Sequence, residues 1–376
     1  MKAVTCAATL LLLVFYLDWQ FKDFWHQSGA DVIVFVQSHF RSQMLDVFFF
    51  LLSEGSIVAV FILVLARFFD SPAQESFKTF LCTFFCIWVT DVLKNFYSEP
   101  RPYWKYEAVV PVRCSSGWGN PSGHAMMVTS VALYQCWLFL KEYPNVNRLY
   151  IILAGALTFF LVEFDRIYLG VHFYSQLALG TLLAVTVVSA FIALDPLLNK
   201  LFVKCRDSLK WTLAMQIPAL LMCAITFGVF SLRPDSWRPE WSDMIRVKCN
   251  SEKFGLYCST TSLFTSTVGV LPFALILVFY YLQKRLVMNW WVDVPLQKRL
   301  LRLLIASLGL LALFIGRTYV MKLLDVTDSF IFGVAFNYFA TVVLFVGILS
   351  FTESFSATTR GERKPSEEYD YELVSK

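Results

Sequence analysis

The chain has 376 residues, of which 57% are hydrophobic and only 16% are charged. Soluble domains average about 45–50% apolar and about 25% charged residues, so this composition excludes an ordinary soluble protein and indicates repeated membrane crossings. A formal net charge of +4, with Lys and Arg dispersed along the chain, argues against a nucleic-acid partner. The sequence also lacks a P-loop, a dinucleotide fingerprint and a zinc-type spacing of Cys and His.

The first apolar run covers residues 3–17 and follows a single basic residue, Lys2. It is short for a membrane-spanning helix, which needs about 20 residues, and it resembles the apolar part of a signal peptide. Asp18 follows the run where a cleavage site of small residues would be expected. We therefore prefer an uncleaved anchor and keep a removed signal as the alternative. Residues 30–43 mix apolar and polar positions at helical spacing, which predicts an interfacial helix.

Nine longer apolar segments follow, and each has to be helical because backbone groups find no water inside a bilayer. They cover about residues 45–69, 77–93, 124–141, 148–164, 172–195, 211–231, 263–283, 301–316 and 329–351. We expect an all-α integral membrane bundle. Its expected parts are an N-terminal anchor and interfacial segment at 1–44, a catalytic core at 45–195, additional membrane helices at 196–355, and a charged tail at 356–376 that is disordered in the cytosol.

The distribution of basic residues predicts how the chain is oriented in the membrane. With nine crossings, alternate loops lie on opposite sides, and one side carries 17 Lys and Arg residues against 12 on the other. The richer side should be cytoplasmic. Three polar clusters, described next, are then expected to face a lumen or the exterior.

The first polar cluster pairs Lys94 with Arg101 at the end of the second predicted span. Pro100 and Pro102 flank Arg101 and favour an extended backbone there. An Arg can hold two phosphate oxygens in a fork while a Lys adds a point charge. The alternative for this cluster alone is two cations whose stems lie in the membrane edge and whose charges reach water.

The second cluster, Asn120-Pro121-Ser122-Gly123-His124, opens the third span. Proline suits a helix start, glycine lets the backbone approach a ligand, and free N–H groups at a helix N-terminus attract anions. These features predict an anion site at the start of this helix. An ordinary cap, with Ser122 as the N-cap residue and His124 incidental, is the alternative.

The third cluster places Arg166 and His172 on either side of the short loop between the fourth and fifth spans. Ionisable groups at that depth are costly, which makes them functional candidates, although a single interfacial histidine is more often structural. Gln176 lies four residues after His172, where its amide oxygen could accept the Nδ1–H proton and orient the ring. Two of the four histidines in the chain therefore occur in Arg- or Gly-bearing polar clusters on one predicted side of the membrane.

The combination Lys94-x6-Arg101-Pro102, Pro121-Ser122-Gly123-His124 and Arg166-x5-His172 resembles the signature of the type 2 phosphatidic acid phosphatase superfamily. That superfamily includes lipid phosphate phosphatases, glucose-6-phosphatase and vanadium haloperoxidases. The resemblance covers about residues 45–195. It implies that His172 is the nucleophile and that His124 acts first as the general acid and then as the base for water.

The same resemblance implies that Lys94, Arg101 and Arg166 hold the phosphate oxygens, helped by the N–H groups of Ser122 and Gly123. Fixed cations would then meet the negative charge of the transition state, and a covalent intermediate would split the displacement into two steps. We therefore expect a phosphomonoesterase that needs no metal and no other cofactor.

Two residues depart from the usual pattern of the superfamily. Asp165 stands where Ser is usual and could either pin Arg166 or weaken its hold on an anion. Gln176 stands where many members have Asp, and here the chain resembles glucose-6-phosphatases, as it also does in Arg101-Pro-Tyr-Trp104 and in Cys114. The Leu45-Asp46-x-Phe-Phe approach to the first core span is more similar to lipid phosphatases.

We expect a lipid phosphate such as phosphatidate as the substrate, because a site at the membrane surface can take a headgroup laterally. Glucose 6-phosphate is a close alternative. A membrane protein that only binds anions is a third possibility, but binding needs cations and not two histidines. The endoplasmic reticulum is the preferred location, with the plasma membrane as the alternative, and the pattern is silent on oligomeric state.

Cysteines on the predicted non-cytosolic side tend to oxidise. Cys249 and Cys258 are close enough in sequence to form a local disulfide, which is our prediction. A bridge from Cys114 to either of them, or free thiols throughout, are the alternatives.

Overall fold

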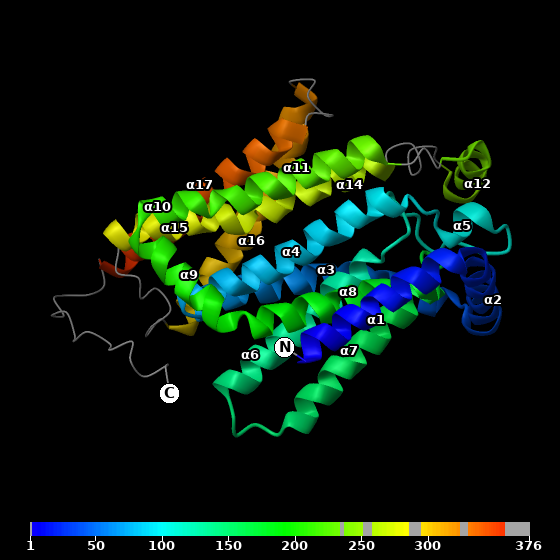
Figure 1. The fold of residues 1–376 in the computed structure, drawn as a ribbon, viewed down its shortest axis with the longest axis horizontal. Coiled ribbons are helices and arrows are strands. Elements are labelled where there is room, and N and C mark those ends of the chain that lie inside the picture. The colour runs from blue at the N-terminus through cyan, green and yellow to red at the C-terminus, as the bar shows by residue number, and fades with distance from the viewer. Residues whose placement is uncertain (1, 234–236, 251–257, 286–294, 324–329, 358–376) are drawn as a thin grey trace.

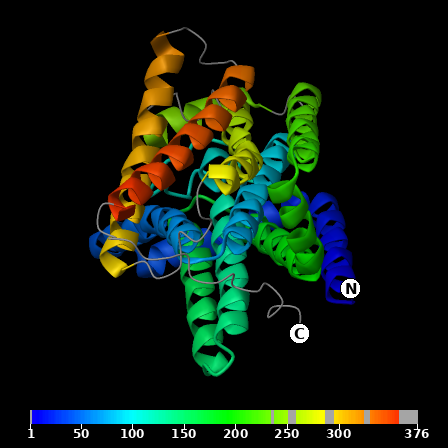
Figure 2. The ribbon, with the colours of Figure 1, turned by 90° about the vertical axis from the view of Figure 1, so that its left-hand side faces the viewer.

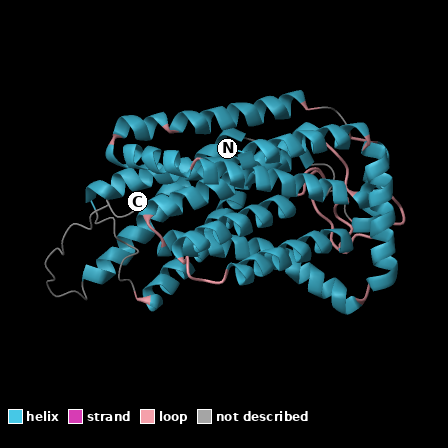
Figure 3. Cartoon of the chain, turned by 60° about the horizontal axis from the view of Figure 1, so that its bottom comes forward, coloured by secondary structure: helices cyan, strands magenta, loops and turns pink. Residues whose placement is uncertain are grey.

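A computed structural model describes residues 2–233, 237–250, 258–285, 295–323 and 330–357. The described residues form helices joined by loops, with no strand among them (Figure 3). In chain order the elements are α1 (Lys2–Gln20), α2 (Lys22–Phe40), α3 (Gln43–Asp70), α4 (Ala73–Tyr97), α5 (Pro102–Lys105), α6 (Gly123–Glu142), α7 (Arg148–Tyr168), α8 (Tyr174–Ala193), α9 (Asp195–Asp207), α10 (Leu209–Ala214), α11 (Gln216–Leu232), α12 (Pro239–Cys249), α14 (Cys258–Ser266), the 3-10 helix η1 (Thr267–Val270), α15 (Leu271–Arg285), α16 (Leu296–Leu323) and α17 (Phe330–Ala357).

Helices occupy every one of the nine predicted spans, which confirms the all-α class. Seven stretches of the described chain are long and apolar enough to cross a bilayer, so the protein is an integral membrane protein. The other two predicted spans correspond to α7 and α16. In α7 the apolar run is interrupted by Arg148 at its start and by charged residues of the third polar cluster at its end. The predicted disordered tail lies outside the described residues from position 358 onward.

The long helices lie side by side in an elongated bundle, and the short helices gather at its two ends (Figure 1). The helix α4 contacts α3, α6, α14 and α15, so it lies inside the bundle. The α6–α7 hairpin and the pair α16 and α17 occupy opposite sides (Figure 2). At one end of the bundle, α2, α5 and α12 lie close together (Figure 1). That end also holds the three polar clusters.

The two N-terminal helices pack on the helices that carry these clusters. The helix α1 contains the first apolar run and lies along α8. The helix α2 contacts α5, α7 and α8, and it contains most of the segment that was predicted to be interfacial. Residues 2–40 therefore contact the expected catalytic core directly.

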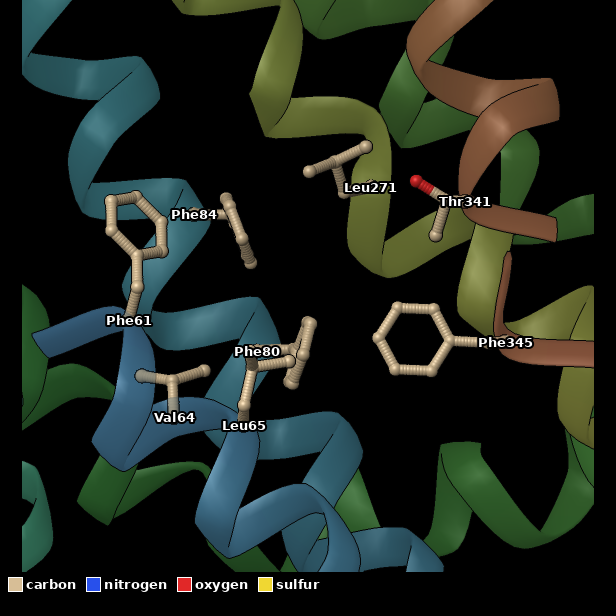
Figure 4. Close-up of a pocket in the computed structure, with 8 residues that line it drawn as sticks. All are labelled: Phe61, Val64, Leu65, Phe80, Phe84, Leu271, Thr341 and Phe345. Atoms are coloured by element: carbon tan, nitrogen blue, oxygen red, sulfur yellow. The ribbon is translucent and has the colours of Figure 1, made fainter. Parts of the chain in front are cut away.

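Aromatic side chains fill the interface between α3, α4, α15 and α17. The ring of Phe68 lies 5.4 Å from that of Phe80 and 4.6 Å from that of Phe345, measured between centroids. A small pocket opens among these helices, and Thr341 supplies its polar lining atom (Figure 4). Its eight lining residues include none from the three polar clusters. The apolar pocket and the polar clusters therefore lie in different parts of the bundle.

The disulfide in the described chain joins Cys114 to Cys249, with their Cα atoms 5.9 Å apart. This corrects the predicted Cys249–Cys258 bridge. The helix α12 packs on α5, and this contact brings Cys249, at the end of α12, to the loop that holds Cys114. Cys258 begins α14 instead, where its thiol is buried. Nearness in sequence was therefore a poor guide, because the tertiary contact decided the partner.

Four tryptophans hold α12 on the loop that follows α5. The rings of Trp104, Trp118, Trp237 and Trp241 all contact one another, with centroid separations from 5.7 to 6.4 Å. Such aromatic pairs add about 0.5–1.5 kcal/mol each beyond the burial of their surface. Together with the disulfide, they attach the second half of the chain to the first two polar clusters.

Candidate functional site

The first polar cluster begins where α4 ends. Arg101 has an extended backbone, with φ −83° and ψ 158°, as its two neighbouring prolines predict, and it precedes α5. Its side chain is buried, although a guanidinium stays charged at any ordinary pH. The hydrogen-bond acceptors around Arg101 therefore determine whether its N–H groups are available to bind phosphate.

The five N–H groups of Arg101 all have acceptors within the chain. Nε donates to the Gly117 carbonyl at 2.9 Å, and Nη2 lies 3.4 Å from the carbonyls of Ser116 and Trp118. Nη1 donates to the Val171 carbonyl at 3.1 Å and lies 3.2 Å from Nε2 of His172. Arg101 thus connects three loops, and one N–H group points at the expected reacting atom. The predicted two-pronged grip on phosphate is not available in this arrangement.

The contacts of His172 define its tautomer. Because the Arg101 guanidinium can only donate, Nε2 of His172 must be the acceptor and carries the lone pair. Nδ1 then carries the proton, and it lies 3.3 Å from Oε1 of Gln176, as the sequence spacing predicted. The Gln176 amide is itself oriented, since its Oε1 accepts from the Phe173 N–H at 3.3 Å and its Nε2 donates to the Pro100 carbonyl at 3.1 Å.

The environment of His172 favours the neutral imidazole. Burial is the largest cause that lowers the pKa of His172 well below its ordinary value, and the positive charges of Arg101, Arg166 and Lys94 lower it further. The hydrogen bond to Gln176 acts in the opposite direction and is the smaller effect. At neutral pH, Nε2 therefore remains unprotonated and able to attack an electrophile.

The second cluster starts α6, and Ser122 is its N-cap residue, with its side-chain oxygen accepting from the Ala125 N–H at 3.4 Å. The Ser122 N–H donates to the Gln176 carbonyl at 3.0 Å. This bond corrects the prediction that the Ser122 N–H contacts phosphate, because that donor is already used between clusters. An added Cβ at Gly123 would lie 3.5 Å from Nζ of Lys94, so the start of α6 lies beside a cation of the first cluster, and the phosphate contact of the Gly123 N–H stays a prediction.

Two buried side-chain nitrogen atoms of the second and third clusters have no hydrogen-bond partner among the described residues. They are Nε2 of His124 and Nη2 of Arg166. Arg166 lies in the last turn of α7, and its Nε pairs with the buried carboxylate of Asp165. Asp165 therefore holds the guanidinium at Nε, while Nη2 has no hydrogen-bond partner among the described residues. Buried polar atoms are normally satisfied, so these two atoms indicate a place for an acceptor such as a phosphate oxygen.

The three clusters meet in the fold. The cations Arg166, Arg113 and Lys94 all lie close enough for their charges to act on His124. Arg113 was missed in the sequence, where it is one more cation in the loop before Cys114. It pairs with Glu54 of α3, and its Nη1 donates to the Ser53 hydroxyl at 3.1 Å. Its position on the non-cytosolic side of the predicted topology was the available signal.

This arrangement has the parts that phosphoryl transfer needs. It offers one unprotonated imidazole nitrogen, a second imidazole, and several fixed cations in a site shielded from water, where charge interactions are strong. No group of three or more His, Cys, Asp or Glu side chains suited to a metal ion occurs in the part of the chain that the structure describes.

Known proteins resemble part of this chain. The profile of the PAP2 superfamily matches residues 76–199. A dihydrosphingosine 1-phosphate phosphatase of Schizosaccharomyces pombe is 26% identical over an alignment of 168 residues, and the alignment covers 40% of this chain and only 38% of that protein. The chain also resembles the crystal structure of a transmembrane PAP2-type phosphatidylglycerolphosphate phosphatase from Bacillus subtilis, with a TM-score of 0.45 and 18% identity over 52% of this chain and 97% of the other.

Proposed function

Because residues 76–199 belong to the PAP2 superfamily, we propose that the protein is an integral-membrane phosphatase that cleaves a phosphomonoester through a phosphohistidine at His172, without a metal. The observation that carries this proposal is the state of His172. Arg101 holds its Nε2 unprotonated, Gln176 orients its Nδ1–H, and cations surround it. An anion-binding protein would need the cations but not this oriented lone pair.

In the first step, the hydrogen bond from Arg101 to Nε2 of His172 breaks, Nε2 attacks the phosphorus atom, and the bond from phosphorus to the substrate oxygen breaks. His124 gives its proton to that leaving oxygen. In the second step, His124 takes a proton from water, the water oxygen attacks phosphorus, and the N–P bond breaks to release phosphate. The unpaired Nη2 of Arg166, together with Lys94 and the Gly123 N–H, stabilises the charge on the transferred group.

The direct test is to trap the phosphohistidine with labelled substrate and to locate it by peptide mapping under acid-free conditions. We expect label on His172 and no turnover in His172→Ala. His39→Ala is the matched control, because this histidine is exposed on α2. Phosphate release by purified His172→Ala at more than a few per cent of the control rate would refute the assigned nucleophile.

Independence from metal is tested separately. The cations already present supply positive charge at the phosphate, so activity should survive EDTA, and vanadate should inhibit as a phosphate mimic. A requirement for added magnesium or zinc would contradict this part of the proposal.

Among substrates we favour a lipid phosphate. The similar Schizosaccharomyces pombe protein is named for a lipid phosphate, and a site at the end of a membrane bundle can receive a headgroup from the bilayer. Glucose 6-phosphate is the second candidate, and Gln176 is the observation that favours it, because it replaces the usual Asp as glucose-6-phosphatases do. Phosphate release from phosphatidate, dihydrosphingosine 1-phosphate and glucose 6-phosphate, measured side by side, separates the two.

We also propose that the site faces a lumen or the exterior, with the endoplasmic reticulum as the preferred membrane. The asymmetry of basic residues and the Cys114–Cys249 disulfide both support this side, since disulfides persist in oxidising compartments. In sealed vesicles of known orientation, a membrane-impermeant maleimide applied after reduction should label Cys249 only from the non-cytosolic face. Labelling from the cytosolic face would reverse our orientation.

A further inference from the structure

The helix α2 supplies a buried contact to Glu99, which lies two residues before Arg101. Glu99 is buried, and its carboxylate lies 2.9 Å from Nζ of Lys22 and 3.5 Å from Nε2 of His26. Removing one partner of a buried charge leaves the other uncompensated, so this position of Glu99 is strongly preferred. The first polar cluster is thereby attached to the N-terminal helices.

The backbone at Glu99 in turn holds the other two clusters. Its carbonyl accepts from the Gly119 N–H at 2.8 Å, directly before the second cluster. The next carbonyl, of Pro100, accepts from the Gln176 amide that orients His172. A shift of Glu99 would therefore move the acceptor on which the orientation of the expected nucleophile depends.

The same face of α2 packs on the residue that follows His172. The ring of His26 stacks on that of Phe173 with centroids 4.4 Å apart and an interplanar angle of 18°. Three residues along, an added Cβ at Gly29 would lie 3.0 Å from Cδ1 and 3.2 Å from Cβ of Phe173. The helix therefore approaches the His172 loop as closely as a glycine allows.

The helix α1 makes a matching contact with the second cluster. Nδ2 of the buried Asn120 donates to Oδ2 of Asp18 at 3.0 Å. Each of the three clusters thus has a buried partner in residues 18–29. None of these partners belongs to the cations or histidines that we place at the phosphate.

We infer that Glu99 and His26 are positioning residues, and that α2 holds the Arg101 and His172 loops at the distance that phosphoryl transfer requires. The inference rests on the proposed function. A displacement of about 1 Å at a reacting group can cost about 100-fold in rate. The contacts from α2 should therefore affect kcat, and they should affect KM little because they do not touch the phosphate.

The test uses two glycine variants of the full-length protein. Gly29→Ala pushes on Phe173, whereas Gly55→Ala, in α3, adds a Cβ that meets nothing within 4 Å. We expect Gly29→Ala to lower kcat by about tenfold, from a displacement of a few tenths of an ångström, with KM changed by less than about threefold. The kcat and KM of Gly55→Ala should each stay within about twofold of the wild-type values, since the space around Gly55 is open.

Two side-chain variants separate stacking from charge. His26→Phe keeps a ring on Phe173 and removes the contact with Glu99, whereas His26→Ala removes both. We expect kcat to fall in the order wild type, His26→Phe, His26→Ala, with thermal unfolding measured on each protein. An unchanged kcat in both His26→Ala and Gly29→Ala, or a loss confined to KM, would overturn the inference.

A readout that does not depend on turnover separates this inference from the proposed function. The rate at which diethyl pyrocarbonate modifies His172, measured by mass spectrometry, should rise in Gly29→Ala and not in Gly55→Ala. If the wild type releases no phosphate from any substrate, the proposed function fails, and the modification rate alone decides whether α2 positions His172. Equal modification rates in both glycine variants would then refute the positioning role.

Discussion

Replacing Gln176 by Leu removes the group that orients the expected nucleophile. In the structure, its Oε1 accepts from Nδ1–H of His172 and from the Phe173 N–H, both at 3.3 Å, and its Nε2 donates to the Pro100 carbonyl. Leucine has a similar volume, so the site stays filled while the three hydrogen bonds are lost. The change therefore tests orientation with little change in packing.

The size of the effect follows from the charge that develops on His172. A neutral hydrogen bond contributes about 0.5–1.5 kcal/mol, and a bond to an ionised group is about twice as strong. As Nε2 bonds to phosphorus, the imidazole becomes cationic, and the bond from Nδ1–H to Gln176 strengthens. The transition state therefore loses about 1–1.5 kcal/mol more than the ground state, which corresponds to about a tenfold lower kcat. Loss of the correct tautomer adds to this, as it does in serine protease triads.

The assay is phosphate release at saturating and limiting substrate by the purified variant in detergent, together with single-turnover labelling of His172. We expect kcat to fall at least about tenfold and KM to change by less than about threefold, since the amide does not hold the phosphate. Gln176→Glu is the companion variant, because it keeps both accepted bonds but places a carboxylate oxygen against the Pro100 carbonyl. A loss confined to KM would make Gln176 a substrate contact and refute the orienting role.

The other predictions concern packing, the disulfide and pH. An added Cβ at Gly119 would lie 2.6 Å from the Pro100 carbonyl oxygen and 2.7 Å from Nε2 of Gln176. Gly119→Ala should therefore lower kcat by more than about tenfold. Gly228→Ala is the control and should leave kcat unchanged, because an added Cβ there meets no atom within 4 Å. Cys114→Ser removes a disulfide that joins residues 135 positions apart, and it should lower the free energy of unfolding by about 2–4 kcal/mol in denaturant titrations. Cys258→Ser removes a thiol outside this disulfide and should leave the mobility of the protein on a non-reducing gel unchanged. Because the pKa of His172 is lower in the folded protein than in the unfolded chain, the unfolded chain takes up a proton on His172 first as the pH falls. The contribution of neutral His172 to the free energy of unfolding is therefore full above about pH 6.5 and is lost as the pH falls below it. The difference in melting temperature between the wild type and His172→Asn should therefore change between pH 7.5 and 5.5, and a constant difference would contradict the lowered pKa.

Local sequence determined the helices and the chemistry of the three clusters. Apolar length alone requires helix in a bilayer, so helices at all nine apolar segments could be predicted, and seven stretches of the described chain are long and apolar enough to cross a membrane. The contact between Gln176 and His172, four residues apart, could be predicted as well, whereas the N-cap at Ser122 was the alternative for its cluster. These features depend on neighbours within one turn of helix, and their spacing is written in the chain.

Only the tertiary structure decided which groups meet across the bundle. The partner of Cys249 depended on the contact of α12 with α5, the N–H of Ser122 was taken by the Gln176 carbonyl, and the donors of Arg101 were taken by loop carbonyls. The pairing of Glu99 with α2 and the pairing of Arg113 with Glu54 of α3 likewise join residues far apart in sequence. Spacing along the chain carries no information about such contacts, because the packing of whole helices sets the distances between their ends.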